Sequence, residues 1–222
     1  WHGGDVSGKT ILIYAEQGFG DTLQFCRYLS LLVQRGAQVL FECHQPLVTL
    51  MQSLGAGITV LPFGQTLPDF DCHLPLLSLP YMLGSTLETI PGKIPYLAAS
   101  ERVVPFWQSV MPMDTGQKIG LCWAGKSYPD PGRRCPPGFL APLASLPNGT
   151  WFSLQIAEKE FQQPFPLQDL TMLVQDFADT DALMERLGLV ITIDTAVAHL
   201  AGALGKPTWL LLPFAPDWRW GL

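Results

Sequence analysis

One stretch near the end of the chain, residues 189–207, constrains the fold more than any other. It begins with Leu189–Ile193, an apolar and largely β-branched run of the length of a buried parallel strand. Asp194 and Thr195 end this run, and Thr195 suits the N-cap of a short helix that Gly205 then stops. Because the first turn of such a helix carries unpaired N–H groups, the stretch predicts a phosphate or sugar site at the edge of an α/β sheet.

The chain alternates expected strands and helices in two successive halves, separated by the Pro- and Gly-containing segment Met111–Gln117. In the first half, strands are expected at 10–15, 38–43, 58–62 and 70–73, and helices at 21–35, 46–54, 75–83 and 102–110. In the second half, strands are expected at 118–123, 150–155, 171–174, 189–193 and 208–213, and helices at 139–145, 179–187 and 195–205. We therefore expect an α/β protein of two domains, residues 1–112 and 117–222, with right-handed crossovers and parallel sheets.

Composition and cysteine usage exclude several classes of protein. The formal net charge of −6 argues against nucleic-acid binding, and no apolar run approaches the roughly 20 residues of a membrane span. The five cysteines form no C-x-x-C pair, which predicts reduced thiols in a cytoplasmic protein. Neither Cys43-His44 nor Cys72-His73 has zinc-site spacing, so no metal site is expected. The chain begins at Trp1 without Met, which predicts a piece of a longer protein.

The loop before the first expected helix contains two glycines and an acid, Gly18-Phe-Gly20-Asp21. Its position after a strand is that of a dinucleotide-binding loop, but Leu23 replaces the third glycine and Glu16 would place a negative charge beside the pyrophosphate. An NAD-binding enzyme is therefore a minor alternative. The glycines allow a backbone or a substrate to approach closely. Asp21 is either a helix N-cap or an acid exposed to a ligand cleft.

Basic side chains gather in the loop after the expected strand 118–123. Lys126, Arg133 and Arg134 stand in this loop of an otherwise acidic protein. Because arginine binds diphosphate groups through forked hydrogen bonds, we interpret the loop as a candidate anion ligand, with a solvated surface as the alternative.

Two further features are a histidine within residues 189–207 and an aromatic run after them. His199 follows Thr195 by four residues, so both side chains can face the same side of the helix. His199 is therefore either a residue of the ligand site or a histidine packed in the core. The run Asp217-Trp-Arg-Trp220 can form the floor of a sugar or base site, but packing between the domains is the favoured interpretation.

Three blocks of residues carry a resemblance to a known family: Ala15–Leu29, Leu121–Gly125 and Asp194–Pro207. The last block, with its D-T-x-x-x-H-L-x-x-A-L-G-x-P pattern, is the most specific. Together they resemble glycosyltransferase family 9, the heptosyltransferase-like family of GT-B fold. The similarity is strongest to the branch found as the C-terminal module of bacterial tetratricopeptide-repeat proteins, which the Asp217–Trp220 ending also fits.

The resemblance implies two Rossmann-like domains whose parallel sheets face each other across a cleft. Residues 1–112 would bind the acceptor and residues 117–222 the nucleotide-sugar donor. The implied reaction is an inverting, metal-independent transfer of a hexose or heptose from a nucleotide-diphosphate-sugar to a hydroxyl of a glycan, lipopolysaccharide or protein. No cofactor besides that substrate is implied, and the parent chain would carry tetratricopeptide repeats.

The resemblance also implies roles for single residues. Asp21 matches the catalytic base, in the loop that Gly18 and Gly20 place at the cleft. Arg133 or Arg134 matches the basic group that neutralises the diphosphate, and Lys126 is a further member of that group. The donor loop is matched by Asp194, Thr195, Ala196 and His199.

Two departures from the family pattern affect these expectations. The chain has D-T-A where heptosyltransferases usually have D-T-G, which leaves donors other than ADP-heptose open. The chain stops at Leu222, so the donor domain is expected to be truncated at its C-terminus. A non-catalytic nucleotide- or sugar-binding module on the same scaffold is the main alternative function.

Overall fold

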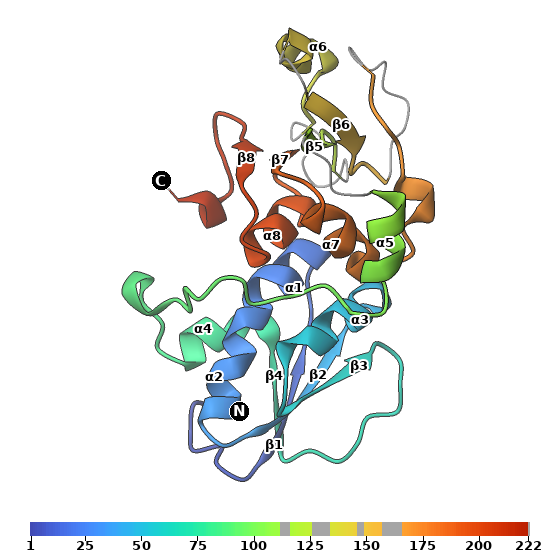
Figure 1. Ribbon diagram of the computed structural model, residues 1–222. Coiled ribbons are helices and arrows are strands. Elements are labelled where there is room, and N and C mark those ends of the chain that lie inside the picture. The colour runs from blue at the N-terminus through green and yellow to red at the C-terminus, as the bar shows by residue number, and fades with distance from the viewer. Residues whose placement is uncertain (112–115, 126–133, 146–148, 157–165, 222) are drawn as a thin grey trace.

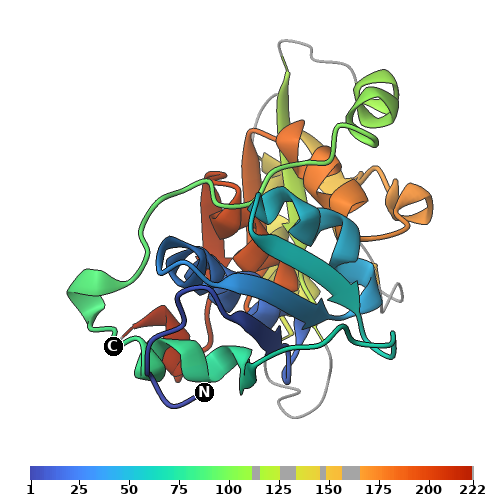
Figure 2. The same ribbon diagram turned by 90° about the horizontal axis from the view of Figure 1, so that it is seen from below.

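The structure of the protein, a computed structural model, describes residues 1–111, 116–125, 134–145, 149–156 and 166–221 (Figure 1). Within these residues the chain forms two parallel four-stranded sheets, with the strand orders β3-β2-β1-β4 and β6-β5-β7-β8. The first sheet lies below the second in Figure 1, with helices between them, and in front of it in Figure 2. The α/β class with two parallel sheets is therefore confirmed.

The first sheet is built from apolar runs whose side chains alternate between its two faces. In chain order its strands are β1 (Thr10–Tyr14), β2 (Gln38–Cys43), β3 (Ile58–Pro62) and β4 (Cys72–Pro75). Ile11 and Ile13 are buried in the main core, whereas Leu12 packs on the other face with Leu40 and Leu61. Because both faces of β1 are covered, its register with β2 is firmly fixed.

The helical segments of the first half are short and contain 3-10 turns. The α-helices are α1 (Phe19–Phe25), α2 (Leu29–Gln34), α3 (Val48–Met51), α4 (Leu79–Met82) and α5 (Val104–Val110). The 3-10 turn Cys26–Tyr28 joins α1 to α2, so the helix expected from residue 21 to 35 is interrupted and begins earlier, at Phe19. Gly36 follows its end with a φ of 83°, a conformation that glycine adopts without strain.

The second sheet contains the strand at the start of residues 189–207, the stretch with which the sequence analysis began. Its strands are β5 (Gln117–Cys122), β6 (Gly149–Ser153), β7 (Leu189–Ile193) and β8 (Thr208–Leu211), and its helices are α6 (Pro137–Leu140), α7 (Phe177–Glu185) and α8 (Ala196–Ala203). All five residues of β7 are buried between β5 and β8. This burial is what an uninterrupted apolar run in a parallel sheet requires.

Two local predictions in the second half are wrong. The strand expected at Thr171–Val174 is a 3-10 turn, because the Asp169 carboxylate accepts hydrogen bonds from both the backbone N and the hydroxyl of Thr171. The N-cap of α7 is Asp176 rather than Asp179, since the Asp176 side chain accepts from the N–H groups of the first turn. The boundary segment Met111–Gln117 lies largely outside the described residues.

Helices from both sheets pack directly on one another. Helix α1 lies against α8, while α3 and α5 lie against α7 (Figure 1). Trp107 of α5 is fully buried, and its Nε1 donates a 2.9 Å hydrogen bond to Asp179 of α7. One buried core therefore runs from β1 through these helices to β7. The packing brings the first turn of α1 beside α8.

Candidate functional site

The donor-loop residues predicted from sequence lie where β7 ends and α8 begins. Asp194 is buried at the carboxyl end of the strand, and Thr195 occupies the N-cap position. The Thr195 side chain makes no capping hydrogen bond, and its hydroxyl lies 3.3 Å from that of Thr192 instead. The first-turn N–H groups of α8 are therefore not capped by this side chain, as an anion site at the helix N-terminus requires.

A glutamine that sequence reasoning missed supports the neighbouring turn after β5. Gln155 is buried, and its Oε1 accepts hydrogen bonds from the backbone N of Trp123 at 3.2 Å and of Ala124 at 2.9 Å. At Gly125, a Cβ atom would lie 3.1 Å from Cγ2 of Thr195. The turn after β5 is thus fixed close to the start of α8. A glutamine at the end of the expected strand 150–155 was the only signal in the sequence.

Asp21 lies in the first turn of α1 and is not its N-cap. Gly18 is the N-cap, and Oδ2 of Asp21 accepts a hydrogen bond from the Gly18 backbone N at 3.2 Å. The side chain is about one-fifth exposed, so the carboxylate is reachable from solvent. Glu16 points elsewhere, because its carboxylate accepts from the backbone N of Leu76 and of Leu77.

The two predicted turns meet in direct contact rather than across open space. A Cβ atom at Gly20 would lie 2.6 Å from Cδ2 of His199, which is closer than atoms can pack. Only glycine at this position lets α1 approach α8 so closely. The contact brings Asp21, in the first turn of α1, close to the donor loop at the start of α8.

We expect Gly20→Ala to destabilise the protein, because the added methyl group must displace His199 or separate α1 from α8. Overpacking of this kind costs about 1–3 kcal/mol. The measurement is urea unfolding followed by circular dichroism. Gly202→Ala is the matched control, since it adds a methyl group to α8 where no atom lies within 4 Å, and should stabilise the helix by about 0.5–1 kcal/mol. Equal stability of the two variants would contradict the contact.

His199 is held between an aromatic ring and two carboxylates. Its ring stacks on Trp220, with the centroids 4.9 Å apart, and its Nε2 lies 3.9 Å from Oδ1 of Asp194. Burial lowers the pKa of His199, and the charges of Asp194 and Asp21 only partly oppose this effect. The imidazole is therefore neutral at neutral pH and suited to hydrogen bonding rather than to carrying charge.

The structure adds Arg219 to the site, a residue that sequence reasoning named only as part of the run Asp217–Trp220. Its Nη2 pairs with the Asp21 carboxylate, and its Nη1 donates a 2.8 Å hydrogen bond to Oδ1 of Asp217. Burial lowers the pKa of Arg219, but the bonds and charges of Asp217 and Asp21 outweigh burial and raise it overall. The run Asp217–Trp220 does pack within the protein, as favoured from sequence, but it packs on the candidate site itself.

The basic loop is only partly described. Lys126 and Arg133 lie outside the described residues, whereas Arg134 is exposed beside them. The backbone N of Cys135 donates to the carbonyl of Trp123 at 2.9 Å, which holds Arg134 near the end of β5. Arg134 is therefore on the same sheet edge as the donor loop.

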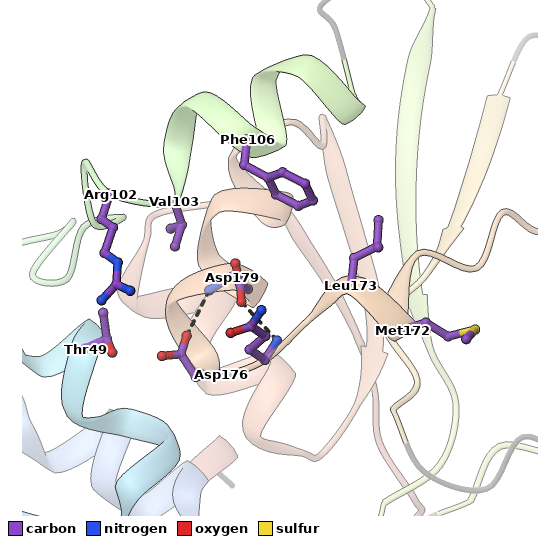
Figure 3. A pocket seen from close by; sticks show the side chains of 9 residues that line it. Thr49, Arg102, Val103, Phe106, Met172, Leu173, Asp176 and Asp179 are labelled. Atoms are coloured by element: carbon purple, nitrogen blue, oxygen red, sulfur yellow. Dashed lines mark hydrogen bonds between the residues drawn. The ribbon is translucent and has the colours of Figure 1, made fainter.

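A separate hollow of about 410 Å³ lies between the first-half helices and α7 (Figure 3). Arg102 and Phe106 line it from the segment around α5, and Asp176 and Asp179 from α7. None of the predicted site residues that the structure describes lines this hollow. Among the described residues, no three His, Cys, Asp or Glu side chains are grouped so that they could hold a metal ion.

Comparison with known sequences gives one curated relative. No protein-family model matches the chain. The chain is 27% identical over 241 aligned positions to Protein FlbA of Caulobacter vibrioides, an alignment that covers 95% of this chain and 40% of FlbA. The chain thus spans about two fifths of the length of that relative. No described helix is both long and apolar enough to cross a membrane.

Solved structures share the fold at low sequence identity. A family 9 glycosyltransferase from Veillonella parvula aligns with a TM-score of 0.65 and 13% identity over 94% of this chain and 82% of that one. The ADP-heptose lipopolysaccharide heptosyltransferase II of Escherichia coli also gives 0.65, with 15% identity over 94% of this chain and 86% of its own. The chain therefore has the GT-B fold of these glycosyltransferases.

Proposed function

We propose that this protein is a glycosyltransferase that moves a sugar from a nucleotide-diphosphate-sugar to an acceptor hydroxyl. The observation that carries the proposal is the contact of Gly20 with His199 within a GT-B fold, because it joins an acidic helix turn to a helix N-terminus. Such a transfer needs two parts. One is an acid that can take a proton, and the other is a set of N–H groups that can hold a diphosphate.

On the donor side, the proposed diphosphate site is the N-terminus of α8. The first-turn N–H groups after Thr195 would hold the phosphate oxygens, and Arg134, with Arg133 and Lys126 from the same loop, would neutralise their charge. Asp194, Ala196 and His199 would complete the donor loop. Because these groups carry the leaving-group charge, the proposed reaction needs no metal ion.

On the acceptor side, Asp21 is the proposed general base. It would take the proton of the acceptor hydroxyl as that oxygen forms its bond to the anomeric carbon. The bond between the anomeric carbon and the diphosphate oxygen breaks on the opposite face, so the configuration inverts and the nucleoside diphosphate leaves. In this proposal, residues 1–112 form the acceptor domain and residues 117–222 the donor domain.

A non-catalytic binding module is the second candidate, because Arg219 already occupies one oxygen of the proposed base. An NAD-binding enzyme has less support. Glu16 is committed to the backbone of Leu76 and Leu77, and Leu23 is fully buried where that motif needs glycine.

The finer parts of the proposal rest on the family resemblance. They are a hexose or heptose donor, a glycan, lipopolysaccharide or protein acceptor, a parent chain with tetratricopeptide repeats, and a cytoplasmic location. The D-T-A sequence at Asp194–Ala196 keeps donors other than ADP-heptose within the proposal.

A thermal-shift screen with ADP-, GDP-, UDP- and CDP-sugars tests donor binding. One donor class should raise the melting temperature, since a ligand at 100 times its Kd stabilises the native state by about 2.7 kcal/mol. Arg134→Ala should reduce the shift, whereas Arg35→Ala, at an exposed site after α2, should retain it. A panel without any shift would contradict the proposed function.

A further inference from the structure

The end of the described chain returns to the site through three residues, Trp218–Trp220, which form a 3-10 turn. The turn begins at Asp217, whose side chain accepts a hydrogen bond from the Arg219 backbone N at 3.0 Å. Trp220 stacks on His199, so the turn is anchored on α8. This anchoring sets Arg219 over the first turn of α1, 198 residues away in the sequence.

The Arg219 guanidinium is fixed on several sides. Asp217 accepts from Nη1, Asp21 accepts from Nη2, and the guanidinium carbon lies 4.6 Å from the ring centroid of Trp218. The side chain is only 18% exposed, and its Nε has no hydrogen-bond partner among the described residues. A planar fork held in this way has lost most of its rotamer freedom before any substrate binds.

The same arrangement fixes both oxygens of the Asp21 carboxylate. The Gly18 backbone N donates to Oδ2, and Arg219 donates to Oδ1. Each carboxylate oxygen can accept two hydrogen bonds, so each retains one position for a proton from elsewhere. Without Arg219, the carboxylate keeps one partner and gains rotational freedom. A displacement of about 1 Å in a reacting group can lower a rate by about 100-fold.

We propose that Arg219 is a positioning residue of the transfer reaction, which orients the Asp21 carboxylate toward the acceptor hydroxyl. The inference rests on the proposed function, because it gives Asp21 the role of general base. Arg219 touches neither reacting atom and acts through Asp21. Its contribution should therefore depend on the carboxylate being present.

A double-mutant cycle on the rate of transfer tests this dependence. Initial rates are measured for wild type, Arg219→Gln, Asp21→Asn and the double variant, with the donor and acceptor that wild type turns over. Arg219→Gln should lower kcat about 10- to 100-fold, while KM for the donor changes less than about twofold. In the Asp21→Asn background, the same substitution should change the residual rate less than about twofold.

Two further variants keep the test interpretable. Arg219→Lys preserves the charge without the planar fork, so an intermediate loss of kcat is expected, and it provides the same cycle if Arg219→Gln does not fold. Arg35→Gln removes an exposed arginine after α2, at the opposite end of the helical segment from Asp21, and should leave kcat unchanged.

The outcomes separate this inference from the proposed function. A wild-type rate in Arg219→Gln overturns the inference alone, as does an equal loss in the presence and absence of the Asp21 carboxylate. A wild-type protein that turns over no donor overturns the proposed function and the inference together.

Discussion

Replacing Asp21 with asparagine should lower the rate of sugar transfer by about 10²- to 10⁴-fold, the range that general acid–base catalysis contributes. Asparagine has almost the same shape as aspartate, and its one amide oxygen can still accept the hydrogen bond of either Gly18 N or Arg219, while an amide nitrogen replaces the other oxygen. It cannot take a proton from an acceptor hydroxyl. The loss should therefore appear in kcat, and donor binding by thermal shift should be unchanged.

Asp69→Asn is the matched control for this substitution, because Asp69 is exposed and lies in the loop between β3 and β4. It should retain the wild-type rate. Equal rates in wild type and Asp21→Asn would remove Asp21 from the mechanism. A loss of donor binding together with the rate would show that Asp21 acts on the donor instead.

The second large effect concerns stability and comes from a buried acid outside the site. Asp181 lies on α7, is 0% exposed, and has both carboxylate oxygens without a hydrogen-bond partner among the described residues. Burial, reinforced by the charge of Glu185 and partly opposed by Lys206, raises the pKa of Asp181 to about 7. The folded protein therefore keeps a proton on Asp181 at pH values where the unfolded chain has released it.

The direction of the pH dependence follows from this difference. Between about pH 4 and pH 7 Asp181 binds one more proton in the native state than in the unfolded state, so its contribution to stability falls as the pH rises through that window. Below and above the window this group contributes no further change. Ionisation of Asp181 should cost the wild-type protein about 2–4 kcal/mol at pH 8 relative to pH 4.

Asp181→Asn should remove this contribution, because an amide does not titrate. Urea unfolding of wild type and variant at several pH values between 4 and 8 measures the difference between the two stability curves. As the pH rises, the free energy of unfolding of Asp181→Asn should increase relative to that of wild type. Asp69→Asn should follow the wild-type curve. A gap between wild type and Asp181→Asn that does not change with pH would show that Asp181 is ionised in the folded protein throughout.

Strands in this chain could be predicted closely from local sequence. The ranges expected for β2, β3 and β7 agree with the structure at both ends, because each is an apolar run between turn residues. The prediction failed at Thr171–Val174, where hydrogen bonds donated by Thr171 to the Asp169 carboxylate override a short apolar run. It also failed at the start of α7, where Asp176 and Asp179 are both suitable N-caps.

The sequence predicted the separate turns of the site but not the contacts between them. Asp21 and Asp194 follow strands whose ends the sequence indicates, so their place at a sheet edge could be inferred. The contact of Gly20 with His199 depends on how α1 packs on α8, and no local pattern encodes it. Arg219 could not be assigned for the same reason, since its partner lies in the first helix of the chain.

The most direct test of the central claim is product analysis of wild-type protein incubated with each nucleotide-sugar and a panel of glycan, lipopolysaccharide and protein acceptors. Chromatography and mass spectrometry would follow both products. The account predicts that one donor is consumed, that its nucleoside diphosphate is released, and that an equal amount of acceptor gains the sugar. A donor that binds and stabilises the protein, yet is recovered intact with every acceptor, would contradict it and identify a binding module.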